Sequence, residues 1–237
     1  MPGYRRLEPR VIPDLSTSIL DRLRSASALM LWRAGAVRVD LEEPFRLASG
    51  NRSPIYVNCR QVLSDPVFMG LFLACARCLL ADRGVASDAV AGGETAGIPY
   101  AAYLAQGLDR SMLYVRKKPK GYGIATRVEG HVSAGARVLM VEDLVTDGGS
   151  KLGFIDALRE AGAVVEDVLV LFDRQQGGEE LLAGHGCRLH SITDRASALA
   201  EGERCGLLTA AERRSVDEYF ADAVRWHEER GFEFQAV

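Results

Sequence analysis

Strand-like and helix-like segments alternate along the chain from Asp88 onward, and this alternation leaves few folds open. The strand-like segments are "DAVAGG", "SMLYVRK", "RVLMVEDL", "VEDVLVLFD" and "CRLHSIT". Helical patterns lie among them as "GIPYAAYLAQG", "SKLGFIDALREAG" and "GGEELLAGHG". Short apolar strands that alternate with helices of this length are typical of a parallel sheet covered on both faces. The sequence therefore predicts an α/β fold with a central parallel sheet flanked by helices.

The segment before the alternation has a different pattern. A first helix is expected from an N-cap at Asp14 to Gly35, and a second helix begins at Asp65 and Pro66. Between them, residues 37–66 contain β-branched pieces separated by "SGNRSP" and "SDP". This pattern predicts two or three antiparallel strands.

We expect residues 1–237 to form a single domain, because a chain of this length can bury one substantial core. Its parts would be an N-terminal helix with a hood (about 1–65), a core (about 66–195) and a helical C-terminal extension (about 196–237). Apolar side chains at helical spacing in that extension predict one helix over about 209–230.

Composition and charge exclude several classes of partner. The 29 basic and 32 acidic side chains leave a net charge of -3, so no general affinity for nucleic acid or an anionic membrane is expected. Five scattered cysteines in a chain of this size fit a reducing, cytoplasmic location. Cys75 and Cys78 lie in an apolar helical run without a second pair, which indicates buried thiols rather than a metal or redox centre. No stretch is apolar for long enough to span a bilayer, and the first residues lack the apolar segment of a secretory signal.

The segment "LMVEDLVTDGGS" joins an apolar strand, two adjacent acids and a glycine loop. The strand delivers Glu142 and Asp143 to the carboxyl edge of the predicted sheet, where ligands bind in open α/β folds. The following glycines allow successive N–H groups to turn inward, and a helix begins there with the positive end of its dipole. Such a loop can hold a phosphate, while the acids can accept hydrogen bonds from neighbouring hydroxyls. Together they predict a site for a ribose 5-phosphate group.

Other interpretations of this segment are less favoured. A glycine turn with an N-cap serine would explain the loop by itself, but this interpretation does not account for the two adjacent acids. The chain contains neither G-x-x-x-x-G-K-S/T nor G-x-G-x-x-G after a strand. The nucleotide-binding classes that depend on those motifs are therefore disfavoured.

The second charged segment is "VRKKPKGYGIATRVEGH", in which four cations precede two glycines. Clustered cations with glycine hinges can bind a polyanion. A solvated charged loop and an RNA-binding patch are the alternatives.

"VLMVEDLVTDGGS" resembles the phosphoribosyl diphosphate (PRPP) motif of the type I phosphoribosyltransferases. Further stretches between about 45 and 193 are similar to one branch of that family, the orotate phosphoribosyltransferases: "FRLASGNRSPIYVNCR", "GGETAGIPYAAYLA", "YVRKKPKGYG", "VEG", "LFDRQQGG" and "HGCRLHSI". The resemblance implies the type I phosphoribosyltransferase fold, with an N-terminal hood and a C-terminal helix. It also implies a glycosyltransferase of the pentosyl class. That enzyme moves the 5-phosphoribosyl group from PRPP to N1 of orotate, giving orotidine 5′-phosphate and diphosphate in the pathway to UMP.

The resemblance also assigns roles to residues at matching positions. Catalysis is assigned to Lys120, Glu142 and Asp143. PRPP would be bound by Arg116, Lys117, Lys120, Tyr122, Glu142, Asp143, Leu144, Val145, Thr146, Asp147, Gly148, Gly149 and Ser150. Orotate would be bound by Thr146, Arg174, Ile55 and Tyr56. Arg174 is chemically suited to this role because a guanidinium can form a two-pronged bond to a carboxylate.

Magnesium and a second subunit follow from the same resemblance. Mg²⁺ would be carried by PRPP, with no direct protein ligand, since this ion is commonly held by substrate phosphates and water. The basic segment would be a lid over the diphosphate, and part of it would reach the neighbouring subunit's site. A homodimer with shared active sites is therefore expected.

Two departures from the family pattern are visible. Many members have lysine where this chain has Ala48 and Ala96, and many have "KDHG" where it reads "KGYG". Compensation by Arg46 or Arg52, or a change of substrate preference, would account for these differences.

Three other functions stay open on the sequence alone. They are a phosphoribosyltransferase for another base, a PRPP-sensing regulator that binds nucleic acid through the basic segment, and a noncatalytic homologue. The four histidines, His131, His185, His190 and His227, have no evident Ser or Cys partner and are expected at the surface or in packing.

Overall fold

The computed structural model describes residues 18–47, 49–119 and 126–235. The chain divides into two compact units, Cys59–Arg195 and the combination of Met1–Asn58 with Ala196–Val237.

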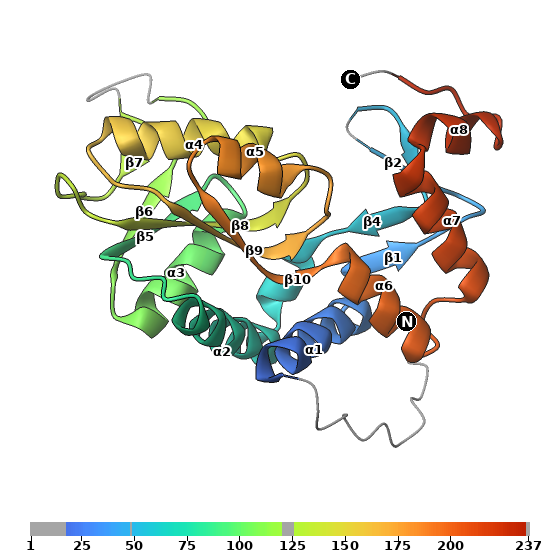
Figure 1. Ribbon diagram of the computed structural model, residues 1–237, viewed down its shortest axis with the longest axis horizontal. Coiled ribbons are helices and arrows are strands. Elements are labelled where there is room, and N and C mark those ends of the chain that lie inside the picture. Colours follow the sequence, from blue (N-terminus) through green and yellow to red (C-terminus); the bar gives the residue numbers. More distant parts are fainter. Residues whose placement is uncertain (1–17, 48, 120–125, 236–237) are drawn as a thin grey trace. The chain divides into compact units, whose positions relative to one another are not determined.

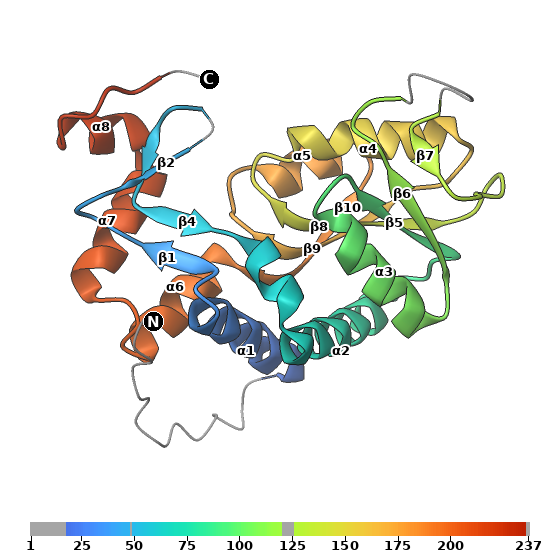
Figure 2. The same ribbon diagram turned by 180° about the vertical axis from the view of Figure 1, so that it is seen from behind.

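A six-stranded sheet forms the centre of the larger unit (Figures 1 and 2). Its strands lie in the order β10-β9-β8-β5-β6-β7. Their bounds are β5 Ala89–Gly93, β6 Ser111–Val115, β7 Val128–Glu129, β8 Val138–Val145, β9 Asp167–Asp173 and β10 Arg188–Asp194. All neighbours are parallel except β7, which pairs antiparallel with β6. The predicted parallel sheet is confirmed.

Helices cover both faces of this sheet, as expected for strands that are apolar on both sides. Figures 1 and 2 show α2 (Pro66–Asp82) and α3 (Gly97–Leu108) on one face, and α4 (Gly149–Glu160) and α5 (Gly178–Gly184) on the other. The α4 side has a continuous buried core in which Ala91, Met140 and Val170 from three strands meet Phe154 and Ile155 from α4. The alternation of strands and helices in the sequence thus corresponds to a sheet with helices packed on both of its faces.

The start of α2 agrees with its sequence signal. The Asp65 carboxylate accepts hydrogen bonds from the N–H groups of Val67 (2.9 Å) and Phe68 (3.1 Å), and Pro66 is the first helical residue. A short 3₁₀ helix, η1 (Cys59–Ser64), precedes this cap. These contacts satisfy N–H groups that have no partner within the helix.

The smaller unit contains α1 (Ile19–Arg33) and four short strands. The strands are β1 (Val37–Val39), β2 (Phe45–Arg46), β3 (Arg52–Ser53) and β4 (Ile55–Val57). They form two separate antiparallel pairs, β1 with β4 and β2 with β3, rather than the two or three strands predicted.

Helix α1 begins later than the sequence predicted. Its N-cap is Ser18, whose hydroxyl accepts a hydrogen bond from the Asp21 N–H at 3.2 Å, whereas Asp14 lies outside the described residues. At its other end the prediction is close, because Gly35 follows the helix with φ +67°.

The C-terminal extension contains three helices, α6 (Arg195–Arg204), α7 (Ala210–Ala221) and α8 (Ala223–Glu228). The prediction of one helix over 209–230 is therefore wrong. Asp222 interrupts it with an extended backbone (φ -154°, ψ 92°), and its carboxylate caps α8 through the Arg225 N–H at 2.9 Å.

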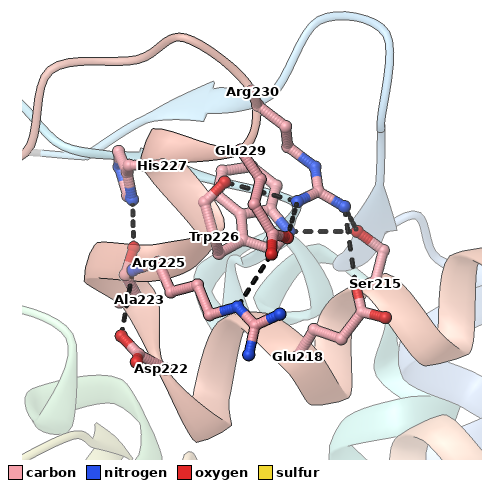
Figure 3. A network of polar contacts seen from close by, with 9 residues as sticks. All are labelled: Ser215, Glu218, Asp222, Ala223, Arg225, Trp226, His227, Glu229 and Arg230. Atoms are coloured by element: carbon pink, nitrogen blue, oxygen red, sulfur yellow. Dashed lines mark hydrogen bonds and ion pairs between the residues drawn. The ribbon is translucent and has the colours of Figure 1, made fainter.

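Side-chain contacts across this break favour the interrupted form (Figure 3). The Trp226 indole N–H donates to the Ser215 hydroxyl at 3.0 Å, and the Trp226 ring meets Tyr219 edge-on at 5.3 Å. The Arg230 guanidinium lies 4.5 Å from the centre of the Trp226 ring and also donates to Ser215 at 3.2 Å. A buried tryptophan whose N–H has a hydrogen-bond partner stabilises this arrangement of α7 and α8.

Within the described residues, no helix combines the length and apolar character needed to cross a membrane.

Candidate active site

A cavity of about 390 Å³ opens at the carboxyl edge of the sheet in the larger unit. Charged side chains dominate its lining, with four cations and three carboxylates. The lining residues are Arg60, Glu94, Thr95, Ala96, Lys117, Arg127, Glu142, Asp143, Ser150, Lys151 and Phe154. Its position is the one expected for a ligand site in an open α/β sheet.

The two adjacent acids belong to strand β8, which continues past them to Val145. Successive side chains of a strand point to opposite faces, so Glu142 and Asp143 do not lie side by side. Glu142 shares the face of Met140, toward α4, and is 4% exposed. Asp143 is on the opposite face, half-buried, near Cys59 of η1. Both acids line the cavity, and they lie within the strand rather than after it.

Glycines make the space that Glu142 occupies. A Cβ on Gly93 would collide with Glu142 Oε1 and would lie 2.6 Å from the Phe154 ring. A Cβ on Gly97 would lie 2.6 Å from the same oxygen. Gly93 and Gly97 of "GGETAG" therefore leave the room that the Glu142 carboxylate of the neighbouring strand needs.

Lys151 holds the other carboxylate oxygen of Glu142. Its ammonium donates to Oε2 at 2.6 Å, and both side chains are largely buried. Burial raises the pKa of Glu142, because the ionised form loses hydration, and Lys151 opposes that shift.

On the other face of the strand, the pKa of Asp143 is subject to similar opposing effects. Burial raises its pKa, while the nearby charges of Lys151 and Arg60 lower it. On this face of the sheet, the Tyr100 hydroxyl donates to the Cys59 carbonyl at 2.6 Å. Both acids are thus placed where an ionised carboxylate needs a positive or hydrogen-bonding ligand.

The loop after β8 turns sharply into helix α4. Gly148 has φ +85°, which only glycine adopts without strain, and Gly149 begins the helix. The Asp147 carboxylate accepts the Gly149 N–H at 3.1 Å, so one of the loop amides already has an internal partner. Ser150 lines the cavity in the first turn of α4.

The other loop residues assigned to PRPP do not all face the cavity. Val145 is fully buried in the core, and Leu144 is half-buried. Thr146 is half-buried beside Gly178, where an added Cβ would lie 3.0 Å from the Thr146 carbonyl oxygen.

Both ends of the basic segment are anchored at the cavity. The backbone N–H of Arg116 donates to the Arg127 carbonyl at 2.8 Å, and the Arg127 guanidinium donates back to the Arg116 carbonyl at 3.0 Å. The Lys117 N–H donates to the Glu94 carboxylate at 2.8 Å. Lys117 and Arg127 line the cavity, whereas the Arg116 guanidinium lies 3.9 Å from Glu129. Lys120 and Tyr122 fall outside the described residues.

The residues assigned to orotate lie in two places. Arg174 follows β9, and its N–H donates to the Val145 carbonyl at 3.0 Å, which places it beside the β8 loop. Ile55 and Tyr56 are on β4 of the smaller unit, where Ile55 is buried and Tyr56 contacts Phe45 at 5.6 Å between ring centres.

Sequence reasoning missed four charged residues of the cavity: Arg60, Glu94, Arg127 and Lys151. Lys151 carried a usable signal, since a cation in the first turn opposes the helix dipole and calls for a nearby anion. Ala96 also lines the cavity, whereas Ala48 lies outside the described residues. Of the proposed compensating residues, Arg52 donates to the Pro44 carbonyl at 2.9 Å within the smaller unit.

The histidines and cysteines show no metal or nucleophile arrangement in the described part of the chain. No group of three or more His, Cys, Asp or Glu side chains there could hold a metal ion. His185 contacts Asp156 and His190 contacts Asp167, each at 2.7 Å, away from the cavity lining.

Gly93→Ala is expected to damage the site, because the new methyl group would displace Glu142 and Phe154. We expect a loss of about 1–3 kcal/mol in stability. Misplacement of Glu142 should lower kcat/KM for the sugar substrate roughly 10- to 100-fold. Gly70→Ala is the control, since nothing lies within 4 Å of its Cβ in α2, and a gain of about 0.5–1 kcal/mol is expected there. Thermal unfolding and steady-state assays check both variants; equal behaviour would contradict the packing argument.

Comparison with known proteins places this chain in a family. No family model matches the chain. A protein of Jannaschia sp. strain CCS1 named orotate phosphoribosyltransferase is 42% identical over 229 residues, which cover 94% of this chain and 97% of the relative. The chain belongs to the orotate phosphoribosyltransferase family.

Solved structures of this family agree with the fold. Orotate phosphoribosyltransferase from Aeropyrum pernix matches with a TM-score of 0.66 and 37% identity, over 76% of this chain and 98% of that one. The enzyme of Mycobacterium tuberculosis H37Rv in complex with PRPP matches with a TM-score of 0.61 and 28% identity, over 74% and 98%. The type I phosphoribosyltransferase fold predicted from the sequence is therefore confirmed.

Proposed function

We propose that this chain transfers the 5-phosphoribosyl group of PRPP to N1 of orotate, giving orotidine 5′-phosphate and diphosphate in UMP synthesis. The observation that carries the proposal is the pair Glu142 and Asp143 at a charged cavity, followed directly by the glycine loop into α4. Membership of the orotate phosphoribosyltransferase family supports the choice of orotate.

The acids bind the sugar in this proposal. As the bond from C1′ to diphosphate breaks, the ribose gains positive charge. Asp143 and Glu142 accept hydrogen bonds from the ribose hydroxyls and favour that cationic sugar. The loop from Thr146 to Ser150 and the N-terminal end of α4 hold the 5-phosphate. No nucleophilic side chain is needed in this proposal.

Cations stabilise the departing diphosphate. Lys117 and Arg127 are already at the cavity, and Arg60 adds a third positive charge. We assign Arg116, Lys120 and Tyr122 to the same lid, which closes over the anion and excludes water. A fixed positive lining favours the transition state because negative charge grows on the leaving group.

Mg²⁺ fits this site as part of the substrate. The described residues contain no metal cluster, and the Glu142 carboxylate is already paired with Lys151. Because that acid is already paired, we propose that the ion is held mainly by diphosphate oxygens and water. When bound there, Mg²⁺ would neutralise part of the leaving group's charge.

Orotate recognition and assembly complete the proposal. Arg174 and Thr146 would contact the base from the ends of β9 and β8, with Ile55 and Tyr56 contributing from the hood. We also propose that residues 1–237 act as one cytoplasmic functional domain and as a homodimer with shared sites. Light scattering of the purified protein tests the last point, since a monomer at assay concentration would contradict it.

A spectrophotometric assay tests the function. Purified protein with PRPP and Mg²⁺ is expected to consume orotate absorbance and to leave hypoxanthine, adenine and uracil unchanged. Turnover of one of those bases without loss of orotate would identify the other-base alternative. Absence of all turnover, with salt-dependent binding of nucleic acid, would favour the alternative of a PRPP-sensing regulator that binds nucleic acid.

A further inference from the structure

Lys151 occupies a position that is unfavourable on two physical grounds. It is the third residue of α4, where the positive end of the helix dipole repels a cation. Its side chain is 12% exposed, and a buried ammonium loses hydration. A lysine in such a place requires a specific anionic partner.

That partner is Glu142, which the protein holds from two sides. Gly93 and Gly97 leave just enough room for Oε1, while the Lys151 ammonium donates to Oε2 at 2.6 Å. Oε1 has no well-aligned hydrogen-bond partner in the described part of the chain. Lys151 is therefore the side chain that fixes how the carboxylate is turned, together with the backbone of Gly93.

Other charges surround the acids at longer range. The groups facing Glu142 and Asp143 across the cavity are Arg60 of η1, Glu94 after β5, Lys117 after β6 and Arg127 before β7, with Cys59 and Tyr100 near Asp143. Within the described residues, Lys151 is the cation at ion-pair distance from either acid. It is thus the group best placed to control their ionisation.

We propose that Lys151 is a positioning residue for the sugar-binding acids, which holds Glu142 ionised and correctly oriented for the ribose hydroxyls. This inference rests on the proposed function. Lys151 acts through Glu142, since its ammonium donates to that carboxylate at 2.6 Å, while its side chain also lines the cavity.

The pH dependence follows from the surrounding charges. Burial raises the pKa of both acids, and the positive charge of Lys151 lowers both. Activity requires the ionised acids, so it falls as the pH drops through their pKa values. Removal of Lys151 takes away the positive charge that opposes the effect of burial, and this loss of activity must then begin at a higher pH.

The test compares Lys151→Met, Lys151→Arg and a control, Arg83→Met, which removes an exposed cation at the end of α2. kcat/KM for PRPP is measured from about pH 5 to 9. For Lys151→Met we expect the acidic limb to move up by about one pH unit or more. Lys151→Arg should restore most of that shift, and Arg83→Met should match the unaltered enzyme.

A double variant keeps the test decisive if Lys151→Met is poorly folded. Glu142→Gln combined with Lys151→Met removes both buried charges, so it should fold better than Lys151→Met alone. Its PRPP affinity by calorimetry should equal that of Glu142→Gln, because no ionised Glu142 remains to be positioned.

Each remaining outcome contradicts the proposal. A loss in Lys151→Met that is equal at every pH, or a further loss of affinity in the double variant, would show that Lys151 contacts the substrate directly. An unaltered profile would show no role. Absence of orotate turnover in the unaltered enzyme would instead overturn the proposed function, which is a separate result.

Discussion

Asp143→Asn is expected to lower kcat/KM for PRPP by about 10²- to 10³-fold, the loss seen when one group that stabilises a transition-state charge is removed. Asp143 lines the cavity on the face of β8 opposite Glu142. The amide keeps the size and one acceptor oxygen of the carboxylate but lacks its negative charge. The affected step is therefore the one in which the sugar becomes cationic.

The same change should leave the protein as stable as before, or more stable. Burial raises the pKa of Asp143 above its usual range, so the folded state prefers the protonated form. When the pKa of a carboxyl group is raised in the folded state, the contribution of that group to stability is fully present below its pKa in the unfolded chain. That contribution is lost as the pH rises through the folded-state pKa. At neutral pH the ionised Asp143 therefore costs stability, and the neutral amide removes that cost.

Activity assays and thermal unfolding at neutral pH check this prediction together. Asp82→Asn is the control, because it neutralises a carboxylate that is 53% exposed outside the cavity. A lower Tm in Asp143→Asn that accounts for the lost activity would mean that Asp143 is structural. Full activity would exclude it from sugar binding.

Lys120→Ala is expected to lower kcat by about 10²- to 10³-fold, through loss of one cation that stabilises the departing diphosphate. Lys120 itself lies outside the described residues, but Lys117 lines the cavity. Lys120 follows Lys117 by three positions in the sequence. The mutual hydrogen bonds of Arg116 and Arg127 hold both ends of this segment together.

Steady-state and single-turnover kinetics with saturating PRPP and orotate check the Lys120 prediction. A transition-state role lowers kcat more than it raises KM for PRPP. Arg83→Ala, which removes an exposed cation from the end of α2, should change neither. An unchanged rate in Lys120→Ala would contradict the assignment of the lid.

Local signals in the sequence were sufficient for several elements. The apolar strands of the larger unit could be read because strands buried on both faces are almost continuously apolar. The start of α2 could be read from Asp65 and Pro66, since the cap depends on neighbours in sequence. The loop after β8 followed from glycines whose backbone freedom is a property of the residue itself.

Other features depended on contacts between distant residues. Asp222 in "YFADAVRW" is a favoured N-cap residue, but it lies within a run of helical spacing. It interrupts the C-terminal helix where Trp226 packs back on Ser215 and Tyr219. The number of short strands in the smaller unit likewise depends on pairing partners, which periodicity does not specify.

The cavity also combines features set by local sequence with features set by contacts between distant residues. The sequence by itself determined the order of strands and helices, the acid pair and the loop that follows it, because these depend on residue type and spacing within one segment. Only the tertiary structure decided that Glu142 and Asp143 face opposite sides of β8, that Gly93 makes room for one of them, and that Lys151 holds it. The physical reason is that burial and ion pairing are set by neighbours brought together from separate strands and helices.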